Sequence, residues 1–211
     1  MTKNGNKRGR CDFIAPHYFP PNRMQSLLGK TGFALALVLL LSACAQRDRE
    51  HKVVISVPEQ KMIVLKKGVP IAQYAVSTSK FGLGDRRGSC ATPLGELEVA
   101  KKIGDNAPSG AVFKSRRRTG EVLAPDTPGR DPIVTRILWL RGLEACNSQA
   151  FGRCIYIHGT PEERNIGSRA SYGCIRMRSC DVISLYNTVG IGARVEIINA
   201  PAEQVIPQVG G

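Results

Sequence analysis

The sequence contains few acidic residues, few aromatic residues and very few histidines. Its 211 residues include 17 Asp and Glu against 30 Lys and Arg, which gives a formal net charge of +13, and only 6% are aromatic. No segment interleaves aromatic with basic residues, which argues against nucleic acid as a partner. The excess positive charge instead favours an anionic partner, such as a cell-wall polymer, an anionic lipid or an acidic peptide. The absence of an internal repeat argues against a repeat architecture.

The sequence also lacks an apolar run long enough to span a bilayer comfortably. The apolar run at residues 31–41 has instead the length of a signal-peptide core. A polar, basic stretch precedes it, and the small residues Ser42 and Ala43 follow it, as a cleavage site requires. We therefore predict that residues 1–43 form a signal peptide. The true start is either the first methionine or Met24, which would give a leader of ordinary length.

The residues Leu41 to Cys44 resemble the lipobox of bacterial lipoproteins, in which the cysteine is lipidated and becomes the mature N-terminus. The resemblance implies a lipid anchor on Cys44, with residues 44–51 as a linker that holds the domain off the membrane. It places the protein in the cell envelope on the periplasmic side, and Ala45 favours the outer membrane where the cell has one. The alternative is an ordinary secretory leader in which this cysteine occurs by chance.

Five cysteines follow the predicted lipidation site, and an oxidising compartment would permit disulfides among them. An odd number fits two bridges and one free thiol. Cys146 and Cys154 flank a short polar loop, which makes them the favoured bridge. Nothing local supports the leftover pair, Cys90 with Cys180, and the connectivity stays open at this point.

Short runs that are β-branched or alternate in polarity, separated by Gly and Pro, predict a mostly β domain over residues 52–199. One helix is expected at residues 181–189, with Ser179 or Asp181 as its N-cap and Gly190 at its end. The expected strands are residues 53–57, 61–65, 71–77, 95–100, 133–140 and 193–198.

Two segments lack such periodicity. Residues 104–132 are rich in Gly, Pro and Arg and predict a long loop, in which the run Arg116–Arg118 is interpreted as solvated rather than as a binding site. Residues 200–211 are interpreted as a loose C-terminal tail. The apolar segment that contains Trp139, the only tryptophan, is interpreted as core.

One cysteine and one histidine could provide a nucleophile and its base. Cys174 and His158 lie sixteen positions apart, and each neighbours a glycine. Residues 154–157 have strand character and lead straight into His158, which would hold the imidazole rigidly. Gly173 permits a tight turn before the cysteine, and the amides of such a turn can converge on one point as an oxyanion hole. Arg176 adds a positive charge that suits a substrate carboxylate.

Other interpretations use the same residues. A structural cysteine and an unrelated core histidine would be favoured if the pair stood alone. A Cys3His zinc site could be assembled from His158 and Cys174 with Cys154 and Cys180. The spacings are not those of a usual zinc motif, so we expect no metal.

A wider pattern reverses the preference for a structural cysteine. Over roughly residues 52–199 the chain resembles the L,D-transpeptidase catalytic domain of the YkuD type, also called ErfK-like. The motif centred on the cysteine is the most specific part of this resemblance. The segments that carry it are His158–Pro161, Asn165–Gly167, Ser171–Met177, Thr92–Gly95 and residues 133–142 and 181–197.

The resemblance implies a sandwich or barrel-like, mostly β domain with one or two short helices. It implies a cysteine acyltransferase that acts on peptidoglycan stem peptides without a cofactor. Cys174 would attack the bond between diaminopimelate and D-alanine and hold the peptide as a thioester. An amine would then accept it, which gives a 3-3 crosslink or attachment to a protein or D-amino acid. Alternatives are an L,D-carboxypeptidase and an inactive wall-binding lipoprotein, and we expect a monomer.

The resemblance also assigns roles around the cysteine. His158 would be the base, and the carbonyl of Gly159 would orient its ring. The amides of Tyr172, Gly173 and Cys174 would form the oxyanion hole. The expected substrate contacts are Ser171, Tyr172 and Arg176.

One position departs from the family pattern. The family usually has histidine just before the Gly-Cys pair, where this chain has Tyr172. A phenol ordinarily has a pKa of about 10, so it is a poor proton relay at neutral pH. Because His158 is retained, we expect activity with an altered acceptor choice or pH dependence. Tyr172 could equally be a stacking platform for substrate, or it could merely fill space.

Overall fold

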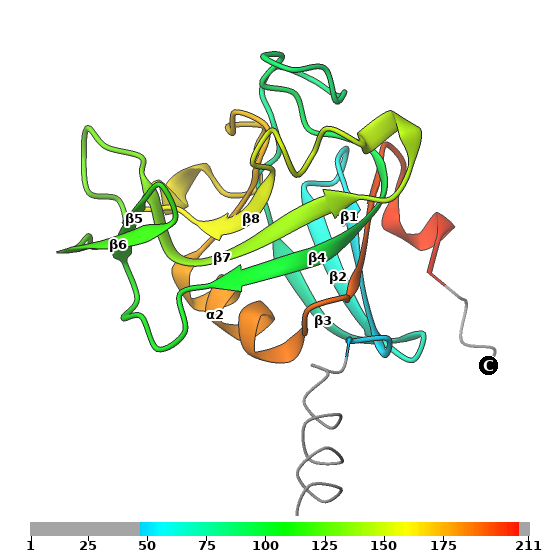
Figure 1. Cartoon of the computed structure of the whole chain (residues 1–211), viewed down its shortest axis with the longest axis horizontal. Helices are drawn as coiled ribbons and strands as arrows, with labels where there is room; N and C mark the ends of the chain where they lie inside the picture. Colours follow the sequence, from blue (N-terminus) through cyan, green and yellow to red (C-terminus); the bar gives the residue numbers. More distant parts are fainter. Residues whose placement is uncertain (1–46, 207–211) are drawn as a thin grey trace, which may run out of the picture. The chain divides into compact units, whose positions relative to one another are not determined.

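The structure, a computed structural model, describes residues 47–206 and has a mostly β fold (Figure 1). The predicted signal peptide, the alternative start at Met24 and the lipidation site Cys44 lie outside the described residues. The described strands form one mixed sheet in the order β3-β2-β1-β10-β4-β7-β5-β6, with β8 paired to β7 and β9 paired to β8. Their bounds are β1 His51–Ser56, β2 Lys61–Lys66, β3 Val69–Ala75, β4 Gly95–Ile103, β5 Ala111–Lys114, β6 Arg117–Val122, β7 Ile133–Gly142, β8 Tyr156–Gly159, β9 Ile175–Met177 and β10 Arg194–Ile198.

The first strand is buried on both faces. Successive residues of a strand point to opposite sides, so Val53 and Ile55 join the large core while Val54 packs in a smaller cluster with Leu65. β1 pairs antiparallel with β2 and parallel with β10, which brings the first and last strands side by side. The described residues of the predicted linker also contact the domain, since the Gly190 amide donates to Asp48 Oδ2 at 2.6 Å.

The described part of the C-terminal segment is packed rather than loose. The 3-10 helix η3, Ala202–Gln204, lies against β1 and β2. Ala202 is fully buried, and its amide donates to Glu59 Oε2 at 2.7 Å. The predicted loose tail is therefore wrong for residues 200–206, because the outer faces of β1 and β2 are apolar and burial of that surface is favourable.

The long strand β7 connects the large core to the site. It pairs with β4 over Ile137–Gly142 and with β5 at Ile133 and Val134, and its pairing with β8 shifts register between Val134 and Ile137. At the shift Thr135 has φ +71°, which is rare for a β-branched residue. Its hydroxyl donates to Ser179 Oγ at 2.9 Å and accepts from the Gly110 amide at 2.9 Å, so the bulge is held by buried hydrogen bonds. Trp139 of β7 is half-buried rather than core.

The segment predicted as a long loop contains the hairpin β5–β6. Its second strand is mostly exposed and carries polar side chains on both faces, so it lacks the alternation that predicts a strand. Its turn, Ser115-Arg116, also lacks the Asn-Gly or Asp-Gly pair that usually marks a tight hairpin. The structure therefore corrects the sequence prediction over residues 111–122.

The predicted helix is present as α2, Ser179–Thr188, which buries Val182, Leu185 and Tyr186 and packs on β7. Its N-cap is Arg178, not Ser179 or Asp181. No side chain of the helix caps it; the Ser179 amide donates instead to Glu163 Oε1 at 2.8 Å. A carboxylate at a helix N-terminus accepts from a free amide and interacts favourably with the positive end of the helix dipole. Glu163, which is distant in sequence, therefore replaces the predicted local cap. No helix in the described part of the chain is long and apolar enough to cross a membrane.

Candidate active site

Two short parallel strands place the predicted nucleophile and base on the same face of the sheet. In the pairing of β8 with β9, Ile157 lies beside Ile175 and His158 lies beside Arg176. Ile157 and Ile175 face the large core, whereas Tyr156 and Cys174 pack against a smaller cluster on the other face. Because side chains alternate along a strand, His158 and Arg176 share the face of Tyr156 and Cys174.

His158 is fixed in one tautomer. Its Nδ1–H donates to the carbonyl of Gly159 at 2.8 Å, the contact that the sequence predicted, which leaves Nε2 as the nitrogen that can accept a proton. Burial lowers the pKa of His158 to about 4, so the ring is neutral at neutral pH. Gly159 allows this arrangement, since a Cβ there would lie 2.7 Å from the carbonyl oxygen of Val134.

The surroundings of Cys174 favour the protonated thiol at neutral pH. It donates to the carbonyl of Cys154 at 3.4 Å, and no hydrogen bond joins it to the imidazole in residues 47–206. Burial raises the pKa of Cys174 to about 11. Such a pair can be neutral or can be a thiolate and an imidazolium, and both pKa shifts favour the neutral pair. The residue as a whole is only partly buried, so a substrate can reach it.

Buried hydroxyl groups stabilise the turn before the cysteine. Gly173 has φ +116°, and a Cβ there would lie 3.2 Å from the carbonyl oxygen of Ala91. Ser171 Oγ accepts from the Gly173 amide at 3.2 Å and donates to the Cys174 carbonyl at 2.5 Å. Thr92 Oγ1 donates to the Gly173 carbonyl at 3.0 Å. The turn therefore has its shape before any ligand binds.

These contacts correct two predicted roles. Ser171 is fully buried, so it supports the turn and does not contact a substrate. The Gly173 amide already has a partner, whereas the amides of Tyr172 and Cys174 make no hydrogen bond within the described residues. Thr92 is a supporting residue that the sequence indicated only through its Thr-Pro-x-Gly motif.

Comparison with known proteins agrees with this geometry. Residues 50–197 match the family described as YkuD, the L,D-transpeptidase catalytic domain. The chain belongs to this family. The match confirms the family predicted from the sequence, and the structure confirms a mostly β fold.

The similar proteins carry related names. The chain is 28% identical to the probable L,D-transpeptidase YcfS of Escherichia coli over 71% of this chain and 44% of that protein. It is 32% identical to the putative L,D-transpeptidase YqjB of Bacillus subtilis over 59% of this chain and 57% of that protein. It thus spans less than two thirds of the length of these relatives. A solved L,D-transpeptidase from Mycobacterium smegmatis is 18% identical, over 71% of this chain and 58% of that one, with a TM-score of 0.46.

Arg176 of this YkuD domain does not present a free charge. The residue is 6% exposed, and its guanidinium forms ion pairs with Asp131 and, at 3.9 Å, with Glu162. Two carboxylates therefore compensate one cation. Of the two roles that the resemblance allows Arg176, these ion pairs favour support of the site over contact with a substrate carboxylate, because the residue's charge is already compensated.

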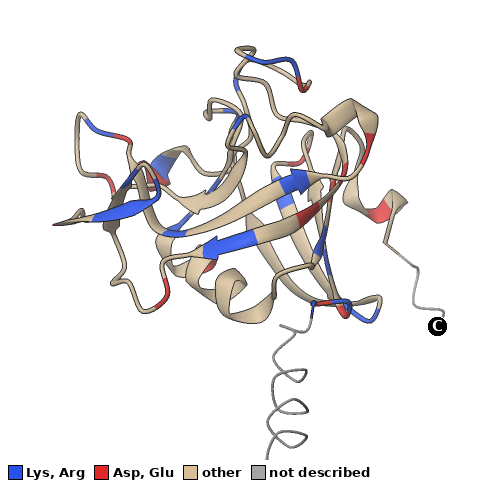
Figure 2. Ribbon diagram, viewed as in Figure 1, with Lys and Arg blue, Asp and Glu red and all other residues tan. Residues whose placement is uncertain are grey.

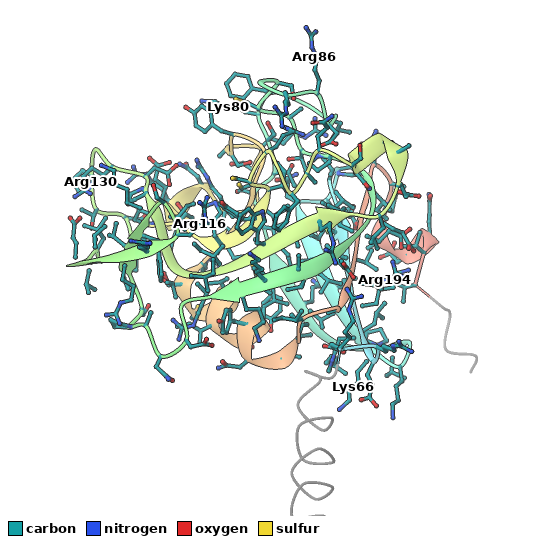
Figure 3. The ribbon with its side chains drawn as sticks, viewed as in Figure 1. Lys66, Lys80, Arg86, Arg116, Arg130 and Arg194 are labelled. Carbon is teal, nitrogen blue, oxygen red and sulfur yellow. The ribbon has the colours of Figure 1, made fainter. Side chains whose placement is uncertain are left out.

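Tyr172 stands on the rim between two cavities. One, of about 430 Å³, is lined by Cys174 and Arg153. The other, of about 670 Å³, is lined by Arg176 and Lys80. The ring is 57% exposed, so Tyr172 does not merely fill space. Lys80, labelled in Figure 3, donates to its hydroxyl at 3.0 Å and lies 4.4 Å from its ring centroid.

The predicted disulfide between Cys146 and Cys154 is not formed. All five cysteines of the described domain are free thiols. Cys146 Sγ lies near the carboxylate of Glu144, whereas Cys154 Sγ lies near the guanidinium of Arg116. Because the two thiols have different surroundings, proximity in sequence does not bring them together. The described residues contain no group of three or more His, Cys, Asp or Glu arranged to hold a metal ion.

Proposed function

We propose that this chain is a peptidoglycan L,D-transpeptidase whose nucleophile is Cys174. Its donor would be a stem peptide that ends in diaminopimelate and D-alanine, and its acceptor an amine. Family membership supports the reaction class. The observation that carries the proposal is the placement of His158 and Cys174 on one face of paired segments, with Nε2 of the histidine unbonded within the described residues.

The proton transfer follows from the two neutral groups. In the resting site the thiol donates to the Cys154 carbonyl, and both pKa shifts oppose an ion pair. Attack therefore requires the thiol to turn toward His158, so that Nε2 takes the proton as sulfur bonds to the carbonyl carbon. The imidazolium then returns the proton to the departing amine of D-alanine, and the peptide remains as a thioester.

The oxyanion would be bound by main-chain amides. Those of Tyr172 and Cys174 are the free donors of the turn, and removing one such donor typically costs about 3 kcal/mol of transition-state stabilisation. The incoming amine would give its proton to His158 and displace sulfur. These steps need no cofactor, because the thioester conserves the energy of the cleaved amide.

The sequence supports proposals about location and organisation. We propose export through a signal peptide at residues 1–43, with a lipid on Cys44 and a catalytic domain at residues 52–199. The protein would then act as a monomer on the periplasmic side of the cell envelope, at the outer membrane where one exists. Mass spectrometry of the protein purified from its own membranes, compared with Cys44→Ala, tests the anchor.

One incubation separates the activities. The protein is mixed with a disaccharide-tetrapeptide, with and without a second amine, and the products are weighed by mass spectrometry. A dimer with loss of D-alanine supports transpeptidation, whereas tripeptide alone supports the L,D-carboxypeptidase. If neither product forms, and wild type carries no more acyl modification on the peptide that contains residue 174 than Cys174→Ala does, the enzyme proposal is wrong. The alternative of an inactive wall-binding protein is then favoured.

A further inference from the structure

The turn of the β5–β6 hairpin has an unusual sequence for its backbone. Its two central residues, Ser115 and Arg116, have φ +49° and φ +65°. A two-residue hairpin turn with two positive φ values normally uses Asn-Gly or Asp-Gly, because glycine adopts this conformation without strain. Backbone strain of this kind persists where the surrounding structure or the function requires it.

The Arg116 side chain lies against an aromatic wall. Its guanidinium carbon is 4.9 Å from the ring centroid of Trp139, and its Nη1 lies 3.3 Å from the hydroxyl of Tyr156. Phe151 stacks on Trp139 with centroids 4.2 Å apart and an interplanar angle of 9°, which holds the wall in place. Figure 3 shows Arg116 reaching from the hairpin toward β7. A guanidinium held on an aromatic face keeps its charge and loses much of its freedom.

This wall borders the nucleophile. Cys174 packs in the same small cluster as Tyr156, and its thiol donates to the carbonyl of Cys154. Arg116 contacts both of these residues, since its Nη1 lies 3.7 Å from Cys154 Sγ. The strained turn therefore places a guanidinium in contact with Cys154 and Tyr156, two residues that lie beside the Cys174 thiol.

Arg116 has no acidic partner within residues 47–206. Two other arginines of the site differ in this respect, since Arg153 pairs with Asp85 at 2.8 Å and Arg176 pairs with Asp131. Arg116 is exposed and keeps most of its N–H donors free. A planar guanidinium with free donors matches the two oxygens of a carboxylate. The lysines and arginines of this hairpin are visible in Figure 2.

We propose that Arg116 binds a free carboxylate of the acyl-donor peptide and so selects donors that carry one beside the scissile carbonyl. The inference rests on the proposed function, whose donor has two such groups, the terminal carboxylate of D-alanine and the side-chain carboxylate of diaminopimelate. Arg116 thereby takes the role that the sequence assigned to Arg176, whose charge is already neutralised.

The test is a double-mutant cycle between Arg116 and the donor. Acylation of Cys174 is measured as kcat/KM for wild type, Arg116→Ala and Arg116→Lys. Three donors are used: the free acid, the terminal amide and the amide of the diaminopimelate side chain. Arg118→Ala is the matched control, because it removes the same charge from the same hairpin and Arg118 is an exposed residue of β6.

Arg116→Ala lowers kcat/KM for the free acid by about tenfold to a hundredfold, the usual effect of losing a hydrogen bond to a charged group. The donor that lacks the bound carboxylate is already poor with wild type and loses no more with the variant. That donor identifies which carboxylate is bound. Arg116→Lys retains part of the activity, and Arg118→Ala retains all of it.

A second variant separates carboxylate binding from a purely structural role. Arg116→Gly fits the positive φ of the turn, so we expect a thermal midpoint near that of wild type. If Arg116 binds the carboxylate, this variant nevertheless reduces donor use as strongly as Arg116→Ala. The inference is overturned if Arg116→Ala reduces kcat/KM equally for all three donors, or leaves it unchanged. If wild type acylates with no donor although iodoacetamide still alkylates Cys174, it is the proposed function that fails.

Discussion

The β2–β3 and β5–β6 hairpins both turn through two residues with positive φ but carry different residues at the tip. In the first, Lys67-Gly68 has φ +51° and φ +83°; in the second, Ser115-Arg116 has φ +49° and φ +65°. Neither tip lines a cavity beside Tyr172, and the Lys67 ammonium of the first tip pairs with Glu50 at 3.0 Å, away from the site. The second places a side chain against Trp139 and Tyr156. The first tip has glycine at its second position, where no side chain is used, whereas the second tip tolerates strain at that position because the Arg116 side chain is used.

The largest expected effect separates the chemistry from the fold. Cys174→Ala lowers formation of the acyl-enzyme and product by at least about 1,000-fold, because no other group can replace the sulfur. The thermal midpoint changes little, as one sulfur atom is lost from a partly buried site. Product mass and a thermal scan measure both quantities. Cys180→Ala is the control, since that thiol is exposed on α2, and an equal loss in the control would contradict the assignment.

The pH dependence distinguishes the site from the rest of the domain. The folded pKa of His158, about 4, is below its ordinary value of 6.5, so acylation stays level at neutral pH and falls about tenfold per unit below pH 4 as the base becomes protonated. Stability linked to this residue is present above pH 6.5 and is lost as pH falls toward 4. The raised pKa of Cys174 acts oppositely, and its stabilisation is lost as pH rises from 9 toward 11.

The predicted pH dependence of activity is measured with a pH series of single-turnover acylation, and that of stability with thermal unfolding followed by circular dichroism at each pH. Alkylation of Cys174 by iodoacetamide is expected to be slow at pH 7 and to rise steeply above pH 9, whereas the exposed Cys146 reacts faster at pH 7. A Cys174 that reacts as fast as Cys146 at neutral pH would show that the resting pair is ionised.

A pair of glycine substitutions sharpens the contrast between the two regions. Gly173 and Gly68 both have positive φ, so alanine at either position costs about 1 to 3 kcal/mol of the free energy of unfolding. A Cβ at Gly173 also lies 3.2 Å from the Ala91 carbonyl, whereas a Cβ at Gly68 meets nothing within 4 Å. Urea denaturation is expected to show a loss in both variants, but acylation falls only in Gly173→Ala. A matching loss of activity in Gly68→Ala would refute this separation.

The smallest effect is expected at the rim. Tyr172→Phe removes the hydroxyl that accepts from Lys80 and keeps the exposed ring. An exposed hydrogen bond of this kind contributes little, so acylation changes by no more than about threefold. The ratio of crosslinked to trimmed product, measured by mass spectrometry, reports whether the ring serves the acceptor. A tenfold fall in acylation would instead give the phenol a part in the chemistry.

The elements that the sequence predicted well are those whose burial is periodic. The expected strands at residues 53–57 and 61–65 closely match β1 and β2, because alternating or continuous apolar residues reflect their burial directly. The β5–β6 hairpin was missed because its exposed strand is polar on both faces. The N-cap of α2 was wrong because Glu163, distant in sequence, supplies the carboxylate.

The amino-acid sequence by itself determined the family and the mostly β class, and it predicted the Gly159 carbonyl that orients the His158 ring. The roles of Cys174 as nucleophile and His158 as base stay predictions. These depend on local residue types and spacings, which a chain carries without folding. Only the tertiary structure decided that Arg176 is neutralised by Asp131 and Glu162 while Arg116 stays free, and that Ser171 is internal to the turn. Which charges remain available to a ligand depends on neighbours from distant segments, and a linear pattern does not contain that information.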